Sequence, residues 1–279
     1  MTIKLIADSG STKTEWCLLA GEKKIICHTQ GLSPYFLSAE QIAHIIESEL
    51  KPKIDGHIPA EIFFYGTGCS NKENIRLVRT AITKVFSGSE IHINHDLLGA
   101  ARSLFGPEKG VACILGTGSN SCFYNGKRIT NNIPGLGYIL GDEGSGTYLG
   151  KKVVQYFLYR TFDADLMDRF MAKFNTSNDE ILEAVYKKPL PNRYLASYAI
   201  FLAENRGHYM IENIIEDGFN DFFFNHLYKY RETWKYPIHF TGSIAYGFKD
   251  VLQEMCKTFE LTLGKVTKKP LDGLIKFHR

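Results

Sequence analysis

The chain has 279 residues, of which 44% are hydrophobic and 23% charged, and its formal net charge is +3. These values are ordinary for a globular protein, and the length suffices for two domains with their own cores. A net charge this small argues against nucleic acid or a membrane surface as a partner. No apolar run approaches the roughly 18 residues that span a bilayer, and no signal peptide is predicted because a core strand already begins at residue 3.

The cysteines indicate a reduced, cytoplasmic protein without a structural metal. They are scattered at positions 17, 27, 69, 113, 122 and 256, and no two form a CxxC pair. Several lie in apolar strand patterns, where a free thiol behaves as a small hydrophobe. The basic cluster of Lys265, Lys268 and Lys269 is interpreted as a solvated loop.

The first candidate site follows the first predicted strand. Residues 3–7 and 16–20 are apolar, and the turn between them carries Asp8, followed by Gly10, Ser11, Thr12, Lys13 and Thr14. Such a turn can aim backbone N–H groups and hydroxyls at a phosphate while the carboxylate faces the accompanying metal. An ordinary hairpin turn is the alternative, because Asp, Gly and Ser are common turn residues.

Alternating strands and helices follow as far as residue 105. Strands are predicted at 23–29, 61–66 and 91–93, and a helix at 97–105. Two further helices are expected to start with capping boxes. The first box pairs Ser38 with Gln41, and the second pairs Ser70 with Glu73.

Asp96 is the candidate catalytic residue. It stands where the strand at 91–93 turns into a helix, so it could serve as the helix N-cap, as a general base for a substrate hydroxyl, or as both. The neighbouring His95 is more typical of a packing or capping residue.

A second loop of similar chemistry opens the second half of the chain, after a predicted hinge at Gly106 and Pro107. The apolar strand 111–115 runs into Gly116, Thr117, Gly118, Ser119, Asn120 and Ser121. Neither loop has the Gly-Lys-Ser/Thr ending of a Walker A motif or the three glycines of a dinucleotide-binding fingerprint. Two strand–turn–strand loops of this kind indicate two related halves that close on a nucleotide.

Residues 135–146 contain five glycines in twelve positions. So many glycines cost chain entropy and are expected where the backbone turns sharply or approaches a ligand. Asp142 and Glu143 could bind sugar hydroxyls or a metal there, or could cap the following helix in a flexible loop.

From about Ser145 the pattern becomes mainly helical. Aromatic and aliphatic residues from Phe219 to Tyr230 recur at helical spacing and are interpreted as core. A strand at 236–240 then leads into Thr241, Gly242 and Ser243, a small-residue turn that could let an adenine ring lie against the backbone.

The order of these elements resembles the sugar kinase/Hsp70/actin superfamily. Within it the chain looks like the N-acetylglucosamine kinase branch of the BadF/BadG-type ATPase family. The closest segments are residues 8–14, Asp96 with Gly99 and Ala100, residues 115–120, and residues 141–145.

That resemblance implies an α/β protein with two RNase H-like (actin/sugar kinase-type) domains and a nucleotide cleft between them. Residues 1–106, completed by the helix 270–279, would form the first domain, and residues 107–269, with helical insertions, the second. It implies Mg²⁺ near Asp8 and Asp96 as the catalytic base. The implied nucleotide contacts are Gly10, Ser11, Thr12, Lys13, Thr14, Gly116, Thr117, Gly118, Gly242 and Ser243. The implied sugar contacts are Tyr35, Ser119, Asn120, Gly137 and Asp142.

The implied function is ATP-dependent phosphorylation of an amino-sugar hydroxyl, with N-acetylglucosamine and its 6-phosphate as the first choice. Tyr35 and Leu136 stand where the eukaryotic-type kinases carry tryptophans, so N-acetylmuramic acid, glucosamine and glucose stay open, as does a homodimer. One alternative is a non-catalytic sugar or nucleotide sensor on the same fold. The other is the activator ATPase of 2-hydroxyacyl-CoA dehydratases, which is disfavoured because its paired cluster-binding cysteines have no counterpart here.

Overall fold

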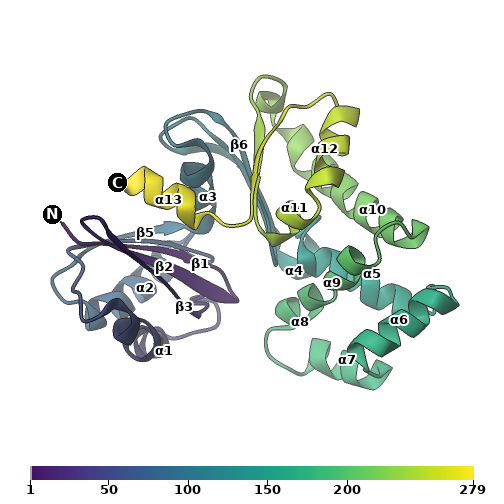
Figure 1. Ribbon diagram of the computed structural model, residues 1–279, viewed down its shortest axis with the longest axis horizontal. Helices are drawn as coiled ribbons and strands as arrows, with labels where there is room; N and C mark the ends of the chain where they lie inside the picture. Colours follow the sequence, from purple (N-terminus) through teal and green to yellow (C-terminus); the bar gives the residue numbers. More distant parts are fainter. Residues whose placement is uncertain (1) are drawn as a thin grey trace. The chain divides into compact units, whose positions relative to one another are not determined.

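The computed structural model describes residues 2–279, and the chain forms two compact units (Figure 1). Unit 1 contains the chain up to Glu108, the segment Asn125–Ile129 and the segment Lys269–Arg279. Unit 2 contains Lys109–Tyr124 and Thr130–Lys268. Each unit has a five-stranded mixed sheet with helices.

The sheet of unit 1 has the strand order β3-β2-β1-β4-β5. Its strands are β1 Lys4–Ser9, β2 Lys13–Ala20, β3 Lys23–Gln30, β4 Glu61–Gly66 and β5 Glu90–His95. The first three are antiparallel neighbours, whereas β1, β4 and β5 run parallel. The carboxyl ends of these three parallel strands therefore share one edge of the sheet.

Helices cover both faces of this sheet. They are α1 Ala39–Ile45, which continues as a π-helical turn Ile46–Leu50 and a 3₁₀ turn Lys51–Ile54, then α2 Lys72–Val85, α3 Asp96–Phe105 and α13 Leu271–His278. Along β1, Leu5 and Ala7 pack into one apolar cluster, and Ile6 packs into another with residues of α13. Figure 1 shows α13 (yellow) beside α3. Gly273 permits this close packing, because a Cβ there would lie 2.2 Å from the Ser103 carbonyl oxygen.

The helix starts test two predictions. The capping box of Ser38 and Gln41 is confirmed at α1, since both of its hydrogen bonds are present. The box of Ser70 and Glu73 is wrong. Asn71 caps α2 instead, and its side chain accepts from the Asn74 N–H at 2.8 Å. Asn and Ser are both favoured caps, so the pattern placed the helix start one residue early.

The sheet of unit 2 has the order β10-β9-β6-β7-β8. Its strands are β6 Gly110–Leu115, β7 Ser119–Tyr124, β8 Ile129–Ile133, β9 Ile238–Thr241 and β10 Leu263–Thr267. Counted from β6, this is the connectivity of unit 1, so the two related halves expected from the paired loops are present in the topology. Both edge strands, β8 and β10, were missed by the sequence patterns.

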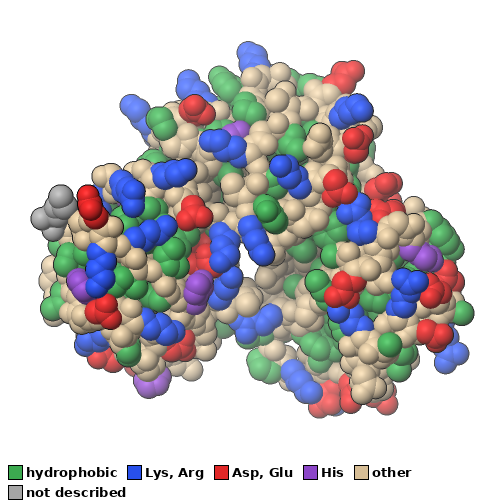
Figure 2. Space-filling view, in the orientation of Figure 1, with side chains coloured by type: hydrophobic (Ala, Val, Ile, Leu, Met, Phe, Trp, Pro, Cys, Tyr) green, Lys and Arg blue, Asp and Glu red, His purple; other side chains and the backbone are tan. Residues whose placement is uncertain are grey.

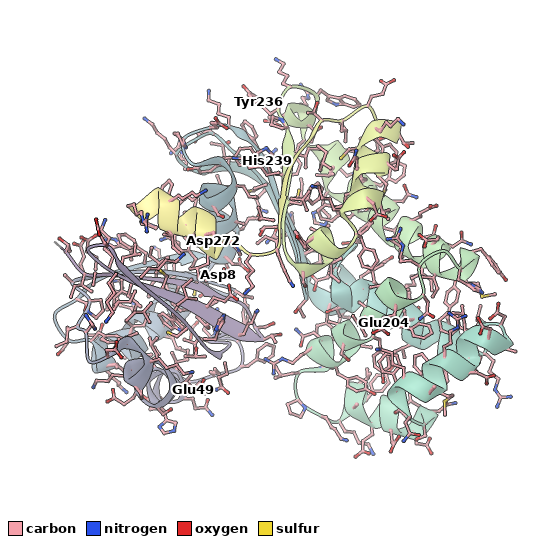
Figure 3. All side chains as sticks on the ribbon, in the orientation of Figure 1. Asp8, Glu49, Glu204, Tyr236, His239 and Asp272 are labelled. Atoms are coloured by element: carbon pink, nitrogen blue, oxygen red, sulfur yellow. The ribbon has the colours of Figure 1, made fainter. Side chains whose placement is uncertain are left out.

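The chain after Ser145 is mainly helical, as predicted. The helices of unit 2 are α4 Gly137–Leu140, α5 Gly146–Leu158, α6 Ala164–Phe174, α7 Asn178–Tyr186, α8 Pro191–Ser197, α9 Ile200–Glu204, α10 Tyr209–Asn225, α11 Ser243–Gly247 and α12 Lys249–Thr258, with 3₁₀ turns at Leu227–Lys229 and Arg231–Trp234. The predicted aromatic stripe is confirmed as core, since Phe219, Phe222 and Tyr230 are fully buried. The ring of His239, labelled on β9 in Figure 3, packs against β10 so closely that only a glycine fits at position 264.

The surface carries charges of both signs. Figure 2 shows lysine and arginine side chains interspersed with aspartate and glutamate over the visible face. Within residues 2–279, no helix is both long enough and apolar enough to cross a bilayer.

Candidate functional site

The predicted metal and catalytic residues of unit 1 lie at the shared edge of three parallel strands. Asp8 is near the end of β1, and Asp96 directly follows β5. Register pairs Ser9 with Gly66 on β4, and Gly66 with His95 on β5, so the two acidic residues flank the end of β4. The crevice beyond the carboxyl ends of parallel strands is where α/β proteins commonly bind ligands. Asp8 is labelled in Figure 3.

Asp96 is the first residue of α3, and His95 occupies the N-cap position without a side-chain capping bond. The expectation that Asp96 could be the N-cap is therefore wrong by one residue. Its carboxylate is nonetheless held on both oxygens. Oδ1 accepts from the Leu97 N–H at 2.8 Å, and Oδ2 accepts from the Thr67 hydroxyl at 2.6 Å.

Thr67 is a residue that the sequence reasoning missed. It follows β4 immediately, its N–H donates to the Ser9 carbonyl at 2.8 Å, and its hydroxyl donates to Asp96. It thus connects the ends of all three parallel strands. The available signal was Gly66-Thr67-Gly68 directly after an apolar strand, the same small-residue pattern that marked the other loops.

The loop after β1 is a tight hairpin whose backbone is held by hydrogen bonds and close packing. The Gly10 N–H donates to the Lys13 carbonyl at 3.0 Å, and the hydroxyls of Ser9 and Thr14 lie 2.7 Å apart. Gly31 packs against the hairpin so closely that a Cβ would lie 2.4 Å from the Ser11 carbonyl oxygen. The hairpin is therefore held in one shape, as a phosphate-binding loop requires.

The buried carboxylate of Glu15 forms polar contacts beside this hairpin. Glu15 on β2 accepts a hydrogen bond from Lys13 at 3.2 Å, lies 3.1 Å from His28, and forms an ion pair with Lys269. The interpretation of Lys265, Lys268 and Lys269 as one solvated loop is thus wrong in part, because all three residues are exposed but they do not form one loop. Lys265 belongs to β10, and Lys269 pairs with a residue 254 positions away in the sequence.

Asp8 lies in an electrostatic environment suited to a cation. Burial raises the pKa of its carboxyl to about 7, and the negative charges of Asp96 and Glu15 act in the same direction. Lys13 and Lys269 oppose the shift only in part. A bound cation would offset this repulsion.

Mg²⁺ is commonly held by one or two carboxylates, with phosphate and water oxygens completing its shell. No group of three or more His, Cys, Asp or Glu side chains able to hold a metal occurs within residues 2–279. The Asp8 carboxylate therefore fits Mg²⁺ that arrives with a nucleotide better than it fits a permanently coordinated metal.

Tyr35 is 62% exposed, yet its ring rests on the turn that holds Asp96. A Cβ added at Gly68 would meet the Tyr35 ring at 2.9 Å. Gly68, against which Tyr35 packs, directly follows Thr67, which bonds to Asp96. The predicted sugar contact Tyr35 and the predicted base Asp96 therefore both contact the turn at residues 67–68.

In unit 2, the predicted phosphate loop and the glycine-rich segment are bonded to each other. The Gly146 N–H donates to the Gly116 carbonyl at 2.8 Å, and the Thr147 N–H to the Thr117 carbonyl at 3.1 Å. Gly118 faces the Asp142 carboxylate, which a Cβ there would approach to 3.1 Å. The helix α5 is capped by Ser145, not by the acidic residues, so Asp142 and Glu143 are available for other contacts.

The Asp142 carboxylate is fixed beside the start of β7. Its Oδ1 accepts from the Ser119 N–H at 3.2 Å. Burial raises the pKa of Asp142 to about 6, and the neighbouring Glu143 contributes in the same direction. Among the residues that the structure describes, the buried Ser119 hydroxyl has no hydrogen-bond partner. A buried polar group without a partner is costly, so an ordered water or a ligand hydroxyl is expected beside it.

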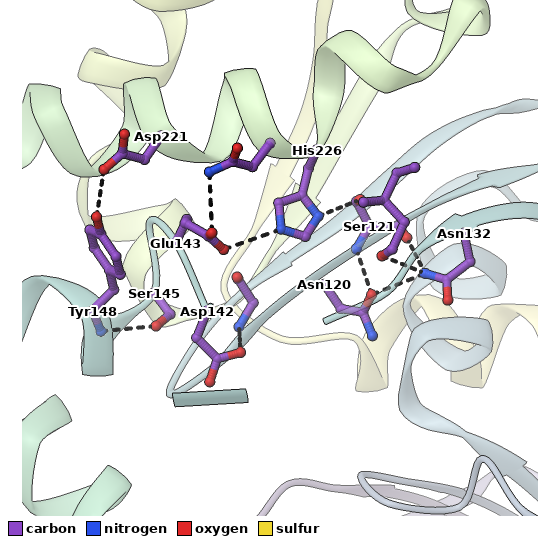
Figure 4. A network of polar contacts seen from close by, with 12 residues as sticks. Asn120, Ser121, Asn132, Asp142, Glu143, Ser145, Tyr148, Asp221 and His226 are labelled. Carbon is purple, nitrogen blue, oxygen red and sulfur yellow. Dashed lines mark hydrogen bonds and ion pairs between the residues drawn. The ribbon is translucent and has the colours of Figure 1, made fainter. Parts of the chain in front are cut away.

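Asn120, the next residue of β7, presents a donor of its own. Its Oδ1 accepts from the Ser121 N–H at 2.9 Å and from Asn132 at 3.1 Å (Figure 4). The side-chain NH₂ group is therefore the part of Asn120 suited to a ligand oxygen. Gly137 begins α4 with a φ of +75°, in the left-handed region that favours glycine.

The turn from β9 to α11 reaches the same loop. Gly242 has a φ of +125°, and a Cβ there would lie 2.2 Å from the Leu115 carbonyl oxygen. Gly242 and Ser243 thus lie against the loop that begins at Gly116. Unit 1 brings together Asp8, the hairpin 10–14, Asp96 and Tyr35. Unit 2 brings together residues 116–120, Asp142 and the turn at 242–243.

Among known proteins, this chain matches solved structures. No family model matches this chain, and no curated protein matches it. A proposed N-acetylglucosamine kinase of Porphyromonas gingivalis is 36% identical, with a TM-score of 0.94 over 100% of this chain and 98% of the other.

Two more distant structures show the fold alone. A proposed N-acetylglucosamine kinase of Chromobacterium violaceum is 15% identical, with a TM-score of 0.78 over 100% of this chain and 99% of the other. A glucokinase of the ROK family from Streptomyces griseus, solved with glucose and AMPPNP, is 14% identical, with a TM-score of 0.61 over 99% and 97%. The predicted fold class, that of actin and the sugar kinases, is confirmed. By its identity and full-length match, this chain belongs to the family of the proposed N-acetylglucosamine kinase of P. gingivalis.

Proposed function

We propose that this protein transfers the γ-phosphoryl group of ATP to a hydroxyl of an amino sugar, with N-acetylglucosamine and its 6-hydroxyl as the first acceptor to test. The observation that carries this proposal is the placement of Asp96. Its carboxylate is held by Thr67 and by the Leu97 N–H at the strand edge where Asp8 also lies. Both units contribute residues to the proposed reaction.

Asp96 would act as the general base. The sugar hydroxyl loses its proton to the Asp96 carboxylate as its oxygen forms a bond to the γ-phosphorus, and the bond from that phosphorus to the β-phosphate oxygen breaks to release ADP. The two hydrogen bonds to Asp96 fix the direction in which its oxygens face, which is the contribution of positioning to such a reaction.

The nucleotide contacts divide between the units. We assign the phosphates to Gly10–Thr14 of unit 1 and Gly116–Gly118 of unit 2, and the adenine to Gly242 and Ser243. The backbone approach at Gly31 and Gly242 supports these assignments, because glycine is required where a loop is tightly packed. Mg²⁺ held at Asp8 would neutralise negative charge on the phosphate oxygens.

The sugar contacts assigned are Tyr35, Ser119, Asn120, Gly137 and Asp142. They supply an aromatic surface, a hydroxyl, an amide NH₂ group, an exposed stretch of backbone and a carboxylate. Hydroxyl and acetamido groups of a hexose can pair with each of these polar groups. The Asp142 carboxylate and the NH₂ group of Asn120, whose Oδ1 already accepts from two donors, are the strongest support for a polar ligand here.

A coupled ADP-release assay with Mg-ATP tests the proposal. The acceptors are N-acetylglucosamine, N-acetylmannosamine, N-acetylmuramic acid, glucosamine and glucose, and Asp96→Asn serves as the paired variant. Sugar-dependent ADP release that is lost in the variant supports a kinase. Sugar binding measured by calorimetry without ADP release would instead indicate a sensor. ADP release that no sugar stimulates would point to an ATPase with another partner.

A further inference from the structure

Glu143 is the neighbour of Asp142 in the sequence and is not among the residues assigned to the sugar. Its side chain is 16% exposed, and it reaches His226, whose side chain is 4% exposed. The Glu143 Oε2 atom lies 3.5 Å from His226 Nε2, and Oε1 accepts from the Asn225 amide at 3.2 Å. The loop that carries Asp142 is thus anchored at the end of α10 (Figure 4).

From His226 the contacts continue to β7. His226 Nδ1 lies 3.1 Å from the Ser121 hydroxyl, and that hydroxyl lies 2.9 Å from the Tyr230 hydroxyl. The Tyr230 oxygen accepts from the Ile133 N–H at 2.7 Å. Ser121 follows Asn120, one of the residues assigned to the sugar. One buried network therefore contacts the residues next in sequence to both Asp142 and Asn120, namely Glu143 and Ser121.

The loop needs such support because its backbone is strained. Asp142 has a φ of +59° and Gly144 a φ of +68°. A left-handed conformation at a residue with a Cβ costs roughly 1–2 kcal/mol, so it persists only where other contacts hold it. Within the loop itself, the Ser145 N–H donates to the Asp142 carbonyl at 3.0 Å.

The contact between Glu143 and His226 is buried, so its loss would be costly. Burial lowers the pKa of His226, and the Glu143 carboxylate opposes this shift. If Glu143 were removed, a buried imidazole nitrogen would be left without its partner, which is costly in a low-dielectric interior.

We propose that Glu143 and His226 are positioning residues, which hold the strained Asp142 loop in the geometry that binds the acceptor sugar. This inference rests on the proposed sugar kinase function. Neither residue is assigned a contact with substrate, so each acts through Asp142 and Asn120. Losing the contact should weaken sugar binding and leave ATP binding unchanged.

Four single variants and one double variant test the inference. Glu143→Met and His226→Met remove the polar contact with side chains of similar size, and their double variant measures the coupling between them. Glu143→Gln keeps an acceptor for Asn225 and an oxygen for His226, so it should restore most of the function. Tyr148→Phe is the matched control, because it removes the 2.5 Å bond from Tyr148 to Asp221, which also joins α5 to α10, without touching Glu143.

Steady-state kinetics give the functional readout. For each Met variant, the sugar KM should rise about tenfold, with kcat within about threefold and the ATP KM unchanged. The double variant should be no worse than the single variants. An unchanged sugar KM, additive losses, or an equal rise in Tyr148→Phe would overturn the inference.

Hydrogen exchange gives a readout that does not depend on the reaction. The amides of residues 141–145 should exchange faster in Glu143→Met and at the wild-type rate in Tyr148→Phe. Unchanged exchange in Glu143→Met overturns the positioning role whatever the kinetics show. If exchange accelerates but no sugar supports turnover in the wild type, the proposed function fails and the positioning of the loop stands.

Discussion

The two units share one sheet connectivity but place opposite chemistry on their corresponding hairpins. In unit 1, the β1–β2 hairpin is surrounded by charge, with Asp8, Lys13 and Glu15 in its own strands and Asp96 close by. In unit 2, the β6–β7 loop from Gly116 to Ser119 has no charged residue, and the carboxylate beside it comes from another loop. The same topology can therefore carry either a charged or a neutral hydrogen-bonding site.

This contrast suggests a division of labour. In the proposed reaction the proton acceptor and the metal-holding group are both carboxylates, whereas a group that selects a sugar has mainly to be correctly oriented. On this view, substitutions of the charged residues Asp8 and Asp96 in unit 1 should act on kcat or on metal dependence. Substitutions of the assigned sugar contacts should act on the sugar KM, and substitution of the tightly packed Gly242 should act on stability.

Asp96→Asn should have the largest effect. Removing the base should lower kcat by about 10²–10⁴, with little change in the sugar KM, because the amide keeps the shape but cannot take the proton. The ADP-release assay measures this, and an unchanged melting temperature shows that the variant is folded. Near-normal turnover in the folded variant would remove Asp96 from its proposed role.

Asp8→Asn should change how stability depends on pH. The pKa of Asp8 is raised from 3.8 to about 7 in the folded protein, so the native state binds the proton more tightly than the unfolded state. Stability should then fall as pH rises from about 4 to about 7, and stay low above that range. In metal-free buffer, the variant should lose this fall and melt higher than the wild type at pH 8, but not at pH 4.

Thermal unfolding from pH 4 to pH 8 measures the effect, and added Mg-ADP should stabilise the wild type more than the variant. Asp142→Asn is the counterpart in unit 2. Its pKa of about 6 places a smaller effect of the same sign between about pH 4 and pH 6. Identical pH profiles for the wild type and Asp8→Asn would contradict the electrostatic account of unit 1.

Gly242→Ala should destabilise unit 2 by about 1–3 kcal/mol, because the new Cβ would both strain the backbone and clash with the Leu115 carbonyl. Urea denaturation measures the free energy of unfolding. Gly247→Ala, at the last residue of helix α11, is the control, since its added Cβ would meet no packed neighbour within 4 Å. Equal stability of the two variants would mean that the turn tolerates a side chain.

Tyr35→Ala should have the smallest effect, a rise of about fivefold in the sugar KM at constant kcat, equivalent to ~1 kcal/mol. Phe36→Ala is the control, because Phe36 is similarly exposed, at 53% against 62%, and is assigned no sugar contact. An equal change in both variants would show a general effect on that loop. A fall in kcat alone would place Tyr35 with the charged machinery of Asp96.

Short-range signals in the sequence predicted much of the fold. The box of Ser38 and Gln41 located a helix start because both partners lie within one turn of each other. The strands that consist of apolar runs were also predicted, because burial makes neighbouring residues apolar. The edge strand β8 was missed because Thr130, Asn131 and Asn132 are polar and exposed, so burial left no periodic mark.

The site was harder to predict where distant residues meet. The ion pair of Lys269 with Glu15 joins residues 254 positions apart, and a basic cluster in a sequence carries no sign of a buried partner. The contact of Glu143 with His226 is hidden for the same reason. Asp8 and Asp96 were identified from their local settings, but the bridge through Thr67 follows only from the register of β1, β4 and β5.

The packing of α13 in unit 1 has a consequence for how the protein forms in the cell. One face of the first sheet, with Ile6, Cys17 and Leu19, is buried by Leu271, Leu274 and Ile275. During synthesis those helix residues emerge only after all of unit 2. Domains generally fold as units as the chain is made, but unit 1 must hold an incomplete apolar face until then. The order of translation therefore makes unit 2 the first part of this protein that can finish folding.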